Sequence, residues 1–241
     1  MLYLIGLGLN ENGITKEGMT ILQKCSKIYL ESYTVNFPYS IVELSKSLGK
    51  EIVELGRDQV ESEKLINEAR KNEVALLIYG CPLFATTHLS LIMDAKKEKV
   101  NTQVIYSASV FDAIASCGLQ LYKFGKITSM PKWQKNYSPD SFLDIVKENL
   151  SIKAHSLILT DIGLDFESAI MQLKESAKKK NLILENIVVC TQLGTDKGKF
   201  FYGSVEEIMK KHKKNILMPF CLIIPGEMHF LEKEAIEGLC E

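Results

Sequence analysis

Short apolar runs alternate with longer amphipathic stretches along most of the chain, and this alternation limits the possible folds more than any other feature. Runs rich in Ile, Leu and Val predict strands at residues 2–7, 27–30, 74–79, 103–106, 156–160, 187–192, 199–202 and 221–224. Helical spacing predicts helices at residues 15–25, 39–47, 61–71, 87–97, 110–115, 141–149, 167–179, 205–211 and 232–239. Alternating strands and helices are typical of an α/β protein with mainly parallel sheets, which is the fold that we expect.

The alternation lapses in the stretch "GKITSMPKWQKNYSPDS", residues 125–141, which contains Pro131 and Pro139. A chain of 241 residues is long enough for two modest domains. We therefore interpret the lapse as a crossover between domains. The prediction is an N-terminal α/β domain over residues 1–124 and a C-terminal α/β domain over residues 125–241.

Charge and cysteine content argue against several classes of protein. The formal net charge is −1, so the overall charge does not favour binding to nucleic acid or to an anionic membrane. No apolar stretch approaches the roughly 20 residues of a membrane span, and no basic segment precedes the first apolar run. The six cysteines form no C-x-x-C pair and lie mostly in apolar runs, which indicates reduced thiols without a metal site. These features predict a cytoplasmic protein.

Small residues follow several of the predicted strands. In the first half they lie in "GLGLN", "YGCPLFATTH" and "YSASV", and in the second half in "LTDIGLD" and "LIIPGEMHF". Ligands of open parallel sheets bind at the edge formed by the carboxyl ends of the strands. We therefore expect a ligand in a cleft between the two domains, facing both sets of loops.

The first of these loops comes close to a dinucleotide-binding fingerprint. In "LIGLGLNENG", residues 4–13, Gly6 and Gly8 have the spacing of G-x-G-x-x-G, but Glu11 occupies the third position. A carboxylate there would repel a pyrophosphate, and Gly13 comes two residues too late. The spacing argues against NAD or FAD. It leaves a tight turn that needs small residues, or a loop whose backbone approaches another ligand.

Taken together and in order, these segments resemble the diphthine synthase family, a protein-modifying branch of the tetrapyrrole methylases. The resemblance extends over nearly the whole chain, through "LYLIGLGLNE", "YLESYT", "GCPLFATTH", "YSASV", "GLQLYKFG", "PDSFLDIVKENL", "HSLILTDI" and "LIIPGEMHFLE". It implies two α/β domains, with S-adenosylmethionine folded into the cleft between them, and a homodimer. The implied reaction is methyl transfer to a modified histidine of translation elongation factor 2 during diphthamide synthesis.

The resemblance also implies a set of cofactor contacts, most of them small or apolar: Leu9, Cys81, Phe84, Ser109, Val110, Thr160 beside Asp161, Leu193 and Phe220. Such residues supply shape, while backbone groups recognise the adenine and the methionine end. Three positions depart from the family pattern. Cys81 replaces the usual aspartate, Phe220 replaces a frequent histidine, and "CTQLG" at 190–194 stands where an Ala-Arg-x-Gly stretch is usual. These departures bear on affinity and activity and leave the fold unaffected.

Methyl transfer to a neutral amine needs no dedicated base, because placing the reactants together supplies ~7–11 kcal/mol. His88, which follows the loop that contains Gly80, Cys81 and Pro82, is a weak candidate for a general base. The alternative is a histidine at a helix start that bonds to the backbone. Glu31, Tyr33 and Thr34 resemble a family motif that faces the cleft, although Glu31 could equally be a solvated charge at a strand end.

Two other functions stay open. Methylation of a small tetrapyrrole would call for arginines to bind the carboxylates of the substrate, and the chain has only Arg57 and Arg70. A catalytically idle S-adenosylmethionine binder that recruits a partner is suggested by Cys81 and Phe220. The sequence does not distinguish trimethylated diphthine from its methyl ester as the product.

Overall fold

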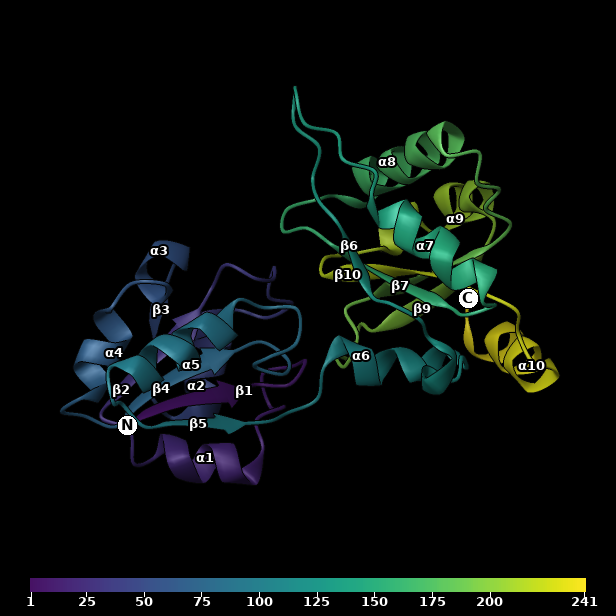
Figure 1. Ribbon diagram of the computed structural model, residues 1–241. Helices are drawn as coiled ribbons and strands as arrows, with labels where there is room; N and C mark the ends of the chain where they lie inside the picture. Colours follow the sequence, from purple (N-terminus) through teal and green to yellow (C-terminus); the bar gives the residue numbers. More distant parts are fainter. The chain divides into compact units, whose positions relative to one another are not determined.

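The computed structural model describes all residues from 1 to 241, in two compact units, Met1–Val110 and Phe111–Glu241. Each unit contains a five-stranded sheet with helices packed against it (Figure 1). The α/β class expected from the alternation is confirmed. The units divide at Val110, whereas the lapse in periodicity predicted a boundary after residue 124.

The sheet of the first unit is parallel throughout, in the order β3-β2-β4-β1-β5. Its strands are β1 (Leu2–Gly6), β2 (Lys27–Glu31), β3 (Val53–Leu55), β4 (Val74–Ile78) and β5 (Thr102–Ile105). The side chains of β4 are buried on both faces, as expected of a central strand in a parallel sheet. Because all the strands run the same way, the loops that follow them lie at one edge of the sheet.

Helices cover both faces of this sheet: α1 (Lys16–Leu22), α2 (Ile41–Leu48), α3 (Arg57–Val60), α4 (Lys64–Ala69) and α5 (His88–Lys97). Neighbouring residues of β4 point to opposite faces, so Leu76 packs in a cluster with α4 and α5, and Leu77 in a cluster with α1 and α2. Local signals fix some of the helix ends. Ser40 and Glu43 form a capping box at the start of α2, and Gly49 ends that helix in the left-handed conformation, with φ +62°.

The sheet of the second unit is mixed, in the order β6-β7-β10-β8-β9. Its strands are β6 (Thr128–Met130), β7 (Ser156–Thr160), β8 (Ile187–Thr191), β9 (Lys199–Gly203) and β10 (Phe220–Ile224). Only β6 and β7 pair in parallel, and the other pairs are antiparallel. The expectation of a mainly parallel sheet is therefore wrong for this half. The segment between β8 and β9 is too short for a crossover helix, so these strands pair as a hairpin.

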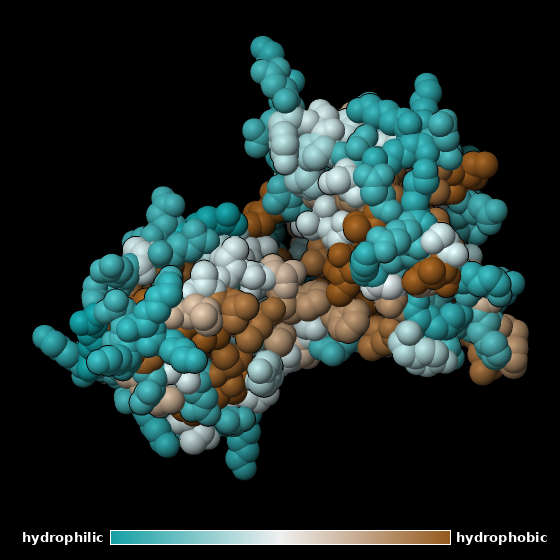
Figure 2. Space-filling model, in the orientation of Figure 1, coloured by the Kyte–Doolittle hydropathy of each residue, from teal (hydrophilic) through white to brown (hydrophobic).

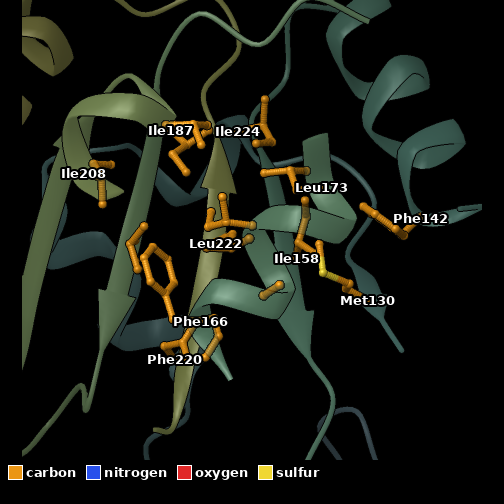
Figure 3. Packing of buried hydrophobic residues seen from close by; sticks show 14 of the residues in the cluster. Met130, Phe142, Ile158, Phe166, Leu173, Ile187, Ile208, Phe220, Leu222 and Ile224 are labelled. Atoms are coloured by element: carbon orange, nitrogen blue, oxygen red, sulfur yellow. The ribbon is translucent and has the colours of Figure 1, made fainter. Parts of the chain in front are cut away.

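The main core of the second unit lies between its sheet and three helices: α7 (Phe142–Ser151), α8 (Phe166–Lys179) and α9 (Val205–Lys211). Figure 3 shows Ile158 and Leu222 of the sheet beside Leu173 of α8. The remaining helical segments are α6 (Val110–Ala113), α10 (Phe230–Leu239) and the 3₁₀ turns η1 (Ile114–Cys117), η2 (Leu121–Lys123) and η3 (Lys213–Asn215). Helix α10 packs against η1, where a Cβ on Gly118 would come within 2.6 Å of Ala235 Cβ.

None of the helices combines the length and the apolar character that crossing a membrane requires. No three His, Cys, Asp or Glu side chains are grouped so that they could hold a metal ion. All six cysteines are free thiols. Burial raises the pKa of Cys117 to about 11 and that of Cys240 to about 12, so both are neutral thiols at physiological pH.

Candidate functional site

The loops that follow β1, β4 and β5 are joined to one another at the carboxyl edge of the first sheet. The amide of Gly80 donates to the carbonyl of Gly8 at 2.9 Å, which links the first two loops. The hydroxyl of Ser107 donates to the carbonyl of Gly13 at 2.9 Å, which links the third loop to the first. The three loops of small residues predicted in the first half are therefore linked to one another by hydrogen bonds.

The glycines of the first loop are needed for close packing of the backbone. A Cβ on Gly6 would come within 2.6 Å of the Gly80 carbonyl oxygen, and a Cβ on Gly13 within 2.6 Å of the Leu7 carbonyl oxygen. Gly8 has φ +69°, and its Cβ would lie 2.8 Å from the Gly13 carbonyl oxygen. For Gly8 and Gly13 the structure supports a tight turn that needs small residues.

Gly80 has a different environment. Its φ is +70°, and a Cβ built on it would meet no atom closer than 3.8 Å, the nearest being Ala108 O and Ser109 Cα. The backbone at Gly80 therefore needs glycine for its conformation, while the space beside it is open. Such a position allows a ligand to approach the backbone at the end of a buried strand.

The predicted contacts of the first unit all lie on these three loops: Leu9 after β1, Cys81 and Phe84 after β4, and Ser109 and Val110 after β5. Leu9 is buried, and its carbonyl accepts a hydrogen bond from the Tyr79 hydroxyl at 3.1 Å. The half-buried Cys81 and Phe84 are in one turn, in which the Phe84 amide donates to the Cys81 carbonyl at 3.2 Å. The structure thus brings together the predicted residues of this half.

The predicted contacts of the second unit lie at one edge of its own sheet. Thr160 ends β7, Leu193 follows β8, and Phe220 begins β10, which runs in the opposite direction. The Thr160 hydroxyl donates to the Phe220 carbonyl at 2.6 Å. The ring of Phe220 packs edge-on against Phe166, with ring centres 5.7 Å apart, and so belongs to the core (Figure 3).

Glu31 and His88, which are two unrelated candidates in the sequence, form a buried pair in the structure. Glu31 is 0% and His88 1% exposed, which excludes a solvated charge at the end of β2. Glu31 Oε1 accepts from the Thr34 hydroxyl at 2.6 Å and from the Thr34 amide at 3.0 Å. His88 Nε2 lies 3.2 Å from Glu31 Oε2, and His88 Nδ1 lies 3.0 Å from the Pro82 carbonyl oxygen. No spacing rule links residues this far apart in the sequence.

A second buried histidine, His155, pairs with Glu232 in the second unit. The Gly226 amide donates to His155 Nδ1 at 2.8 Å, so the ring proton is on Nε2, which donates to Glu232 Oε1 at 3.0 Å. Burial lowers the pKa of His155, which fits a neutral ring. Burial opposes ionisation of Glu232, but hydrogen bonds from Lys123 and two backbone amides hold the pKa of this carboxyl at about 2.

Comparison with known proteins decides the family. The sequence profile of the Tetrapyrrole (Corrin/Porphyrin) Methylases matches residues 1–209. The chain belongs to the tetrapyrrole methylase family. Within the family it is similar to the diphthine synthase of Methanocaldococcus jannaschii, with 38% identity over 100% of this chain and 99% of that protein. It is also 32% identical to the diphthine methyl ester synthase of Schizosaccharomyces pombe, over 99% of this chain and 94% of that protein.

Solved structures agree with this assignment. A putative diphthine synthase from Entamoeba histolytica superposes with a TM-score of 0.90 and 29% identity, covering 100% of this chain and 98% of that one. A second diphthine synthase gives a TM-score of 0.89 and 26% identity, covering 99% and 95%. The resemblance seen in the sequence is confirmed, and this tetrapyrrole methylase is an S-adenosylmethionine-dependent methyltransferase of the diphthine synthase type.

Proposed function

We propose that this methyltransferase transfers methyl groups from S-adenosylmethionine to the diphthamide precursor on the modified histidine of translation elongation factor 2. The observation that carries the proposal is the match to an archaeal diphthine synthase and to a fungal diphthine methyl ester synthase, each over almost the entire chain. The chain has only two arginines for binding the carboxylates of a tetrapyrrole, which argues against a substrate of that class.

The edge of the first sheet has the properties that a cofactor site of this kind needs. The loops present small and apolar residues, and the space beside Gly80 admits a ligand to the backbone. We propose that the cofactor is held by the predicted contacts, namely Leu9, Cys81, Phe84, Ser109 and Val110 in the first unit and Thr160, Leu193 and Phe220 in the second. S-adenosylmethionine, when bound, supplies an electrophilic methyl group on a sulfonium.

The protein contributes binding, orientation and exclusion of water. The acceptor amine must be neutral to attack, and aligning it with the methyl group accounts for ~7–11 kcal/mol of the barrier. His88 is 1% exposed, and each of its ring nitrogens faces a protein atom. This burial favours a structural role for His88 and proton loss from the acceptor to water.

Two further properties belong to the proposal. A cytoplasmic location agrees with six cysteines that are all free thiols. A homodimer, as the resemblance implies, would cover some of the apolar side chains that are exposed on α10, where Phe230 is 67% and Leu239 59% exposed. Figure 2 shows apolar patches among the hydrophilic side chains on the face in view.

The test is methyl transfer to elongation factor 2 in two forms. One form carries the diphthamide precursor because it comes from cells that lack this methyltransferase, and the other carries an unmodified histidine. We expect transfer only to the first, with the number of added methyl groups read by mass spectrometry of the modified peptide. Cofactor binding without any transfer would indicate an idle binder, and transfer to a tetrapyrrole would contradict the proposal.

A further inference from the structure

We propose that a single proton held between Glu31 and His88 fixes the loop after β4, residues 81–87, in the shape that presents the cofactor contacts. Glu31 and His88 are then positioning residues that do not touch the substrate. The inference rests on the proposed function, because it concerns the loop that carries Cys81 and Phe84.

Glu31 and His88 each have one side-chain atom that faces only the other residue. Glu31 Oε2 and His88 Nε2 are both buried and lie 3.2 Å apart. Neither atom has a hydrogen-bond partner in the structure, so their contact is an ion-pair distance and not yet an aligned hydrogen bond. Unpaired buried polar atoms are costly, and a hydrogen placed between the two atoms would satisfy both.

The backbone partner of His88 determines where the protons are. A carbonyl oxygen only accepts, so His88 Nδ1, 3.0 Å from Pro82 O, must carry a hydrogen. A neutral ring would then present the lone pair of Nε2 to a carboxylate, which is also an acceptor. The pair therefore needs one more proton. Oε1 of Glu31 accepts three hydrogen bonds, two from Thr34 and one from the Tyr33 amide, which favours an ionised Glu31 and a doubly protonated His88.

His155 and Glu232 provide an internal contrast. His155 Nδ1 accepts from the Gly226 amide, so the neutral ring already has a hydrogen on Nε2 to donate to Glu232. The same residue types therefore hold no extra proton in the second unit. The difference arises because a backbone amide faces one ring and a backbone carbonyl faces the other.

The pair connects a rigid element to a strained loop. Glu31 ends β2, and Thr34 holds its carboxylate, while His88 begins α5 and contacts Pro82 at the start of the loop. Within the loop, Ala85 has φ +52°, a conformation that a residue with a Cβ rarely adopts. Such strain persists only where surrounding contacts impose it, and the contacts of His88 supply this restraint.

The other ionisable groups near the pair come from two segments, the chain after β2 and helix α3 with its C-cap Glu61. The Tyr33 ring lies edge-on to the His88 ring, with centres 6.5 Å apart, and the Arg57 guanidinium lies 5.3 Å from the centre of the Tyr33 ring. Glu61 accepts from the Thr87 hydroxyl at 3.0 Å. Burial, with the nearby Glu31 charge, raises the pKa of Tyr33 above its usual 10.0, so this phenol stays neutral near physiological pH.

The experiment compares Glu31→Gln with Glu31→Leu, and Glu61→Gln is the matched control for loss of a nearby carboxylate. A glutamine at position 31 keeps an oxygen for Thr34 and supplies an N–H to a neutral His88. We expect S-adenosylhomocysteine to bind Glu31→Gln within about threefold of the wild type and Glu31→Leu at least about tenfold more weakly, since the leucine leaves buried donors unpaired. Michaelis constants for S-adenosylmethionine should follow the affinities, with little change in kcat.

The pH dependence separates a shared proton from simple packing. As pH is raised, wild-type affinity should fall if the pair gives up a shared proton, and affinity of Glu31→Gln should stay constant because its amide N–H replaces that proton. Glu61→Gln should follow the wild type. Equal pH profiles for Glu31→Gln and the wild type would overturn the proposal.

Two measurements on the free protein are independent of the cofactor. Nitrogen NMR of labelled histidine, assigned with His88→Gln, should show both ring nitrogens of His88 protonated at neutral pH. Amides of residues 81–87 should exchange faster in Glu31→Leu than in Glu31→Gln. A neutral His88 ring, or equal exchange in the two variants, would refute the proton-held loop. Failure of the wild type to bind S-adenosylmethionine would refute the proposed function instead.

Discussion

Gly80 offers the sharpest test of the proposed cofactor site, through the substitution Gly80→Ala. The added methyl group meets no protein atom closer than 3.8 Å, so it does not overpack the protein itself. It enters the open space at the carboxyl edge of the first sheet. If the cofactor lies in that space, the methyl group removes room that the ligand needs.

The cost to folding is that of backbone strain alone. With φ +70°, an alanine at this position costs ~1–2 kcal/mol. For a chain of this length that lowers Tm by roughly 2–8 °C, since ~1 kcal/mol corresponds to about 2–4 °C. Gly49→Ala is the matched control, because Gly49 has φ +62° and nothing within 4 Å, yet it ends α2. The two variants should lose similar stability.

Calorimetric titration with S-adenosylmethionine and S-adenosylhomocysteine separates the two variants. Gly49→Ala should bind like the wild type, and Gly80→Ala should bind at least about tenfold more weakly, equivalent to ~1.4 kcal/mol. Unchanged affinity in a folded Gly80→Ala protein would show that this glycine serves only the turn. The proposed location of the cofactor would then be wrong.

Three other predictions follow from the same structure. Gly8→Ala should lower Tm more than Gly80→Ala does, because its Cβ would lie 2.8 Å from the Gly13 carbonyl oxygen and the loop must move. Cys81→Ser and Cys81→Ala should leave methyl transfer within about tenfold, and Cys81→Asp should tighten cofactor binding by restoring a charged acceptor, as titration and initial rates will show. His155 has a pKa below its usual 6.5, so its neutral form stabilises the fold, and this stability is lost as pH falls below about 6.5. Glu232, with a pKa of about 2, loses its contribution as pH falls from about 4.5 towards 2. Thermal melts of the wild type and His155→Gln between about pH 7 and about pH 2 test both predicted losses of stability. A wild-type Tm that does not decrease as the pH is lowered would contradict them.

Much of the first unit could be predicted from the sequence because its central strands are continuous apolar runs. The run at 74–79 predicted β4 to within a residue, and the alternation of strands and helices along the chain predicted the parallel sheet. The three-residue strands β3 and β6 were missed, because three residues are too few to show a period. The antiparallel pairing of the second sheet was also missed. A strand that is buried on both faces is a continuous apolar run, and such a run does not indicate whether its neighbours are parallel or antiparallel.

The loops of the candidate site were predicted for a similar reason, because they follow strands that were easy to recognise. The pairing of Glu31 with His88 was not predictable, since it depends on how β2 and the start of α5 meet in space. The number of protons that the pair holds could not be predicted from the sequence either. That property is set by the carbonyl of Pro82, a backbone atom whose position the sequence does not reveal.

Two of the three departures from the family pattern, Cys81 and Phe220, lie where backbone atoms make the contacts that the structure records. The Cys81 carbonyl accepts from the Phe84 amide, a bond that any side chain at position 81 permits. The Phe220 carbonyl accepts from the Thr160 hydroxyl, while the Phe220 ring packs in the core against Phe166. A change of side chain at either position therefore leaves the local backbone contact intact. Because small and apolar loops recognise ligands mainly through backbone groups, both departures are compatible with the proposed methyl transfer.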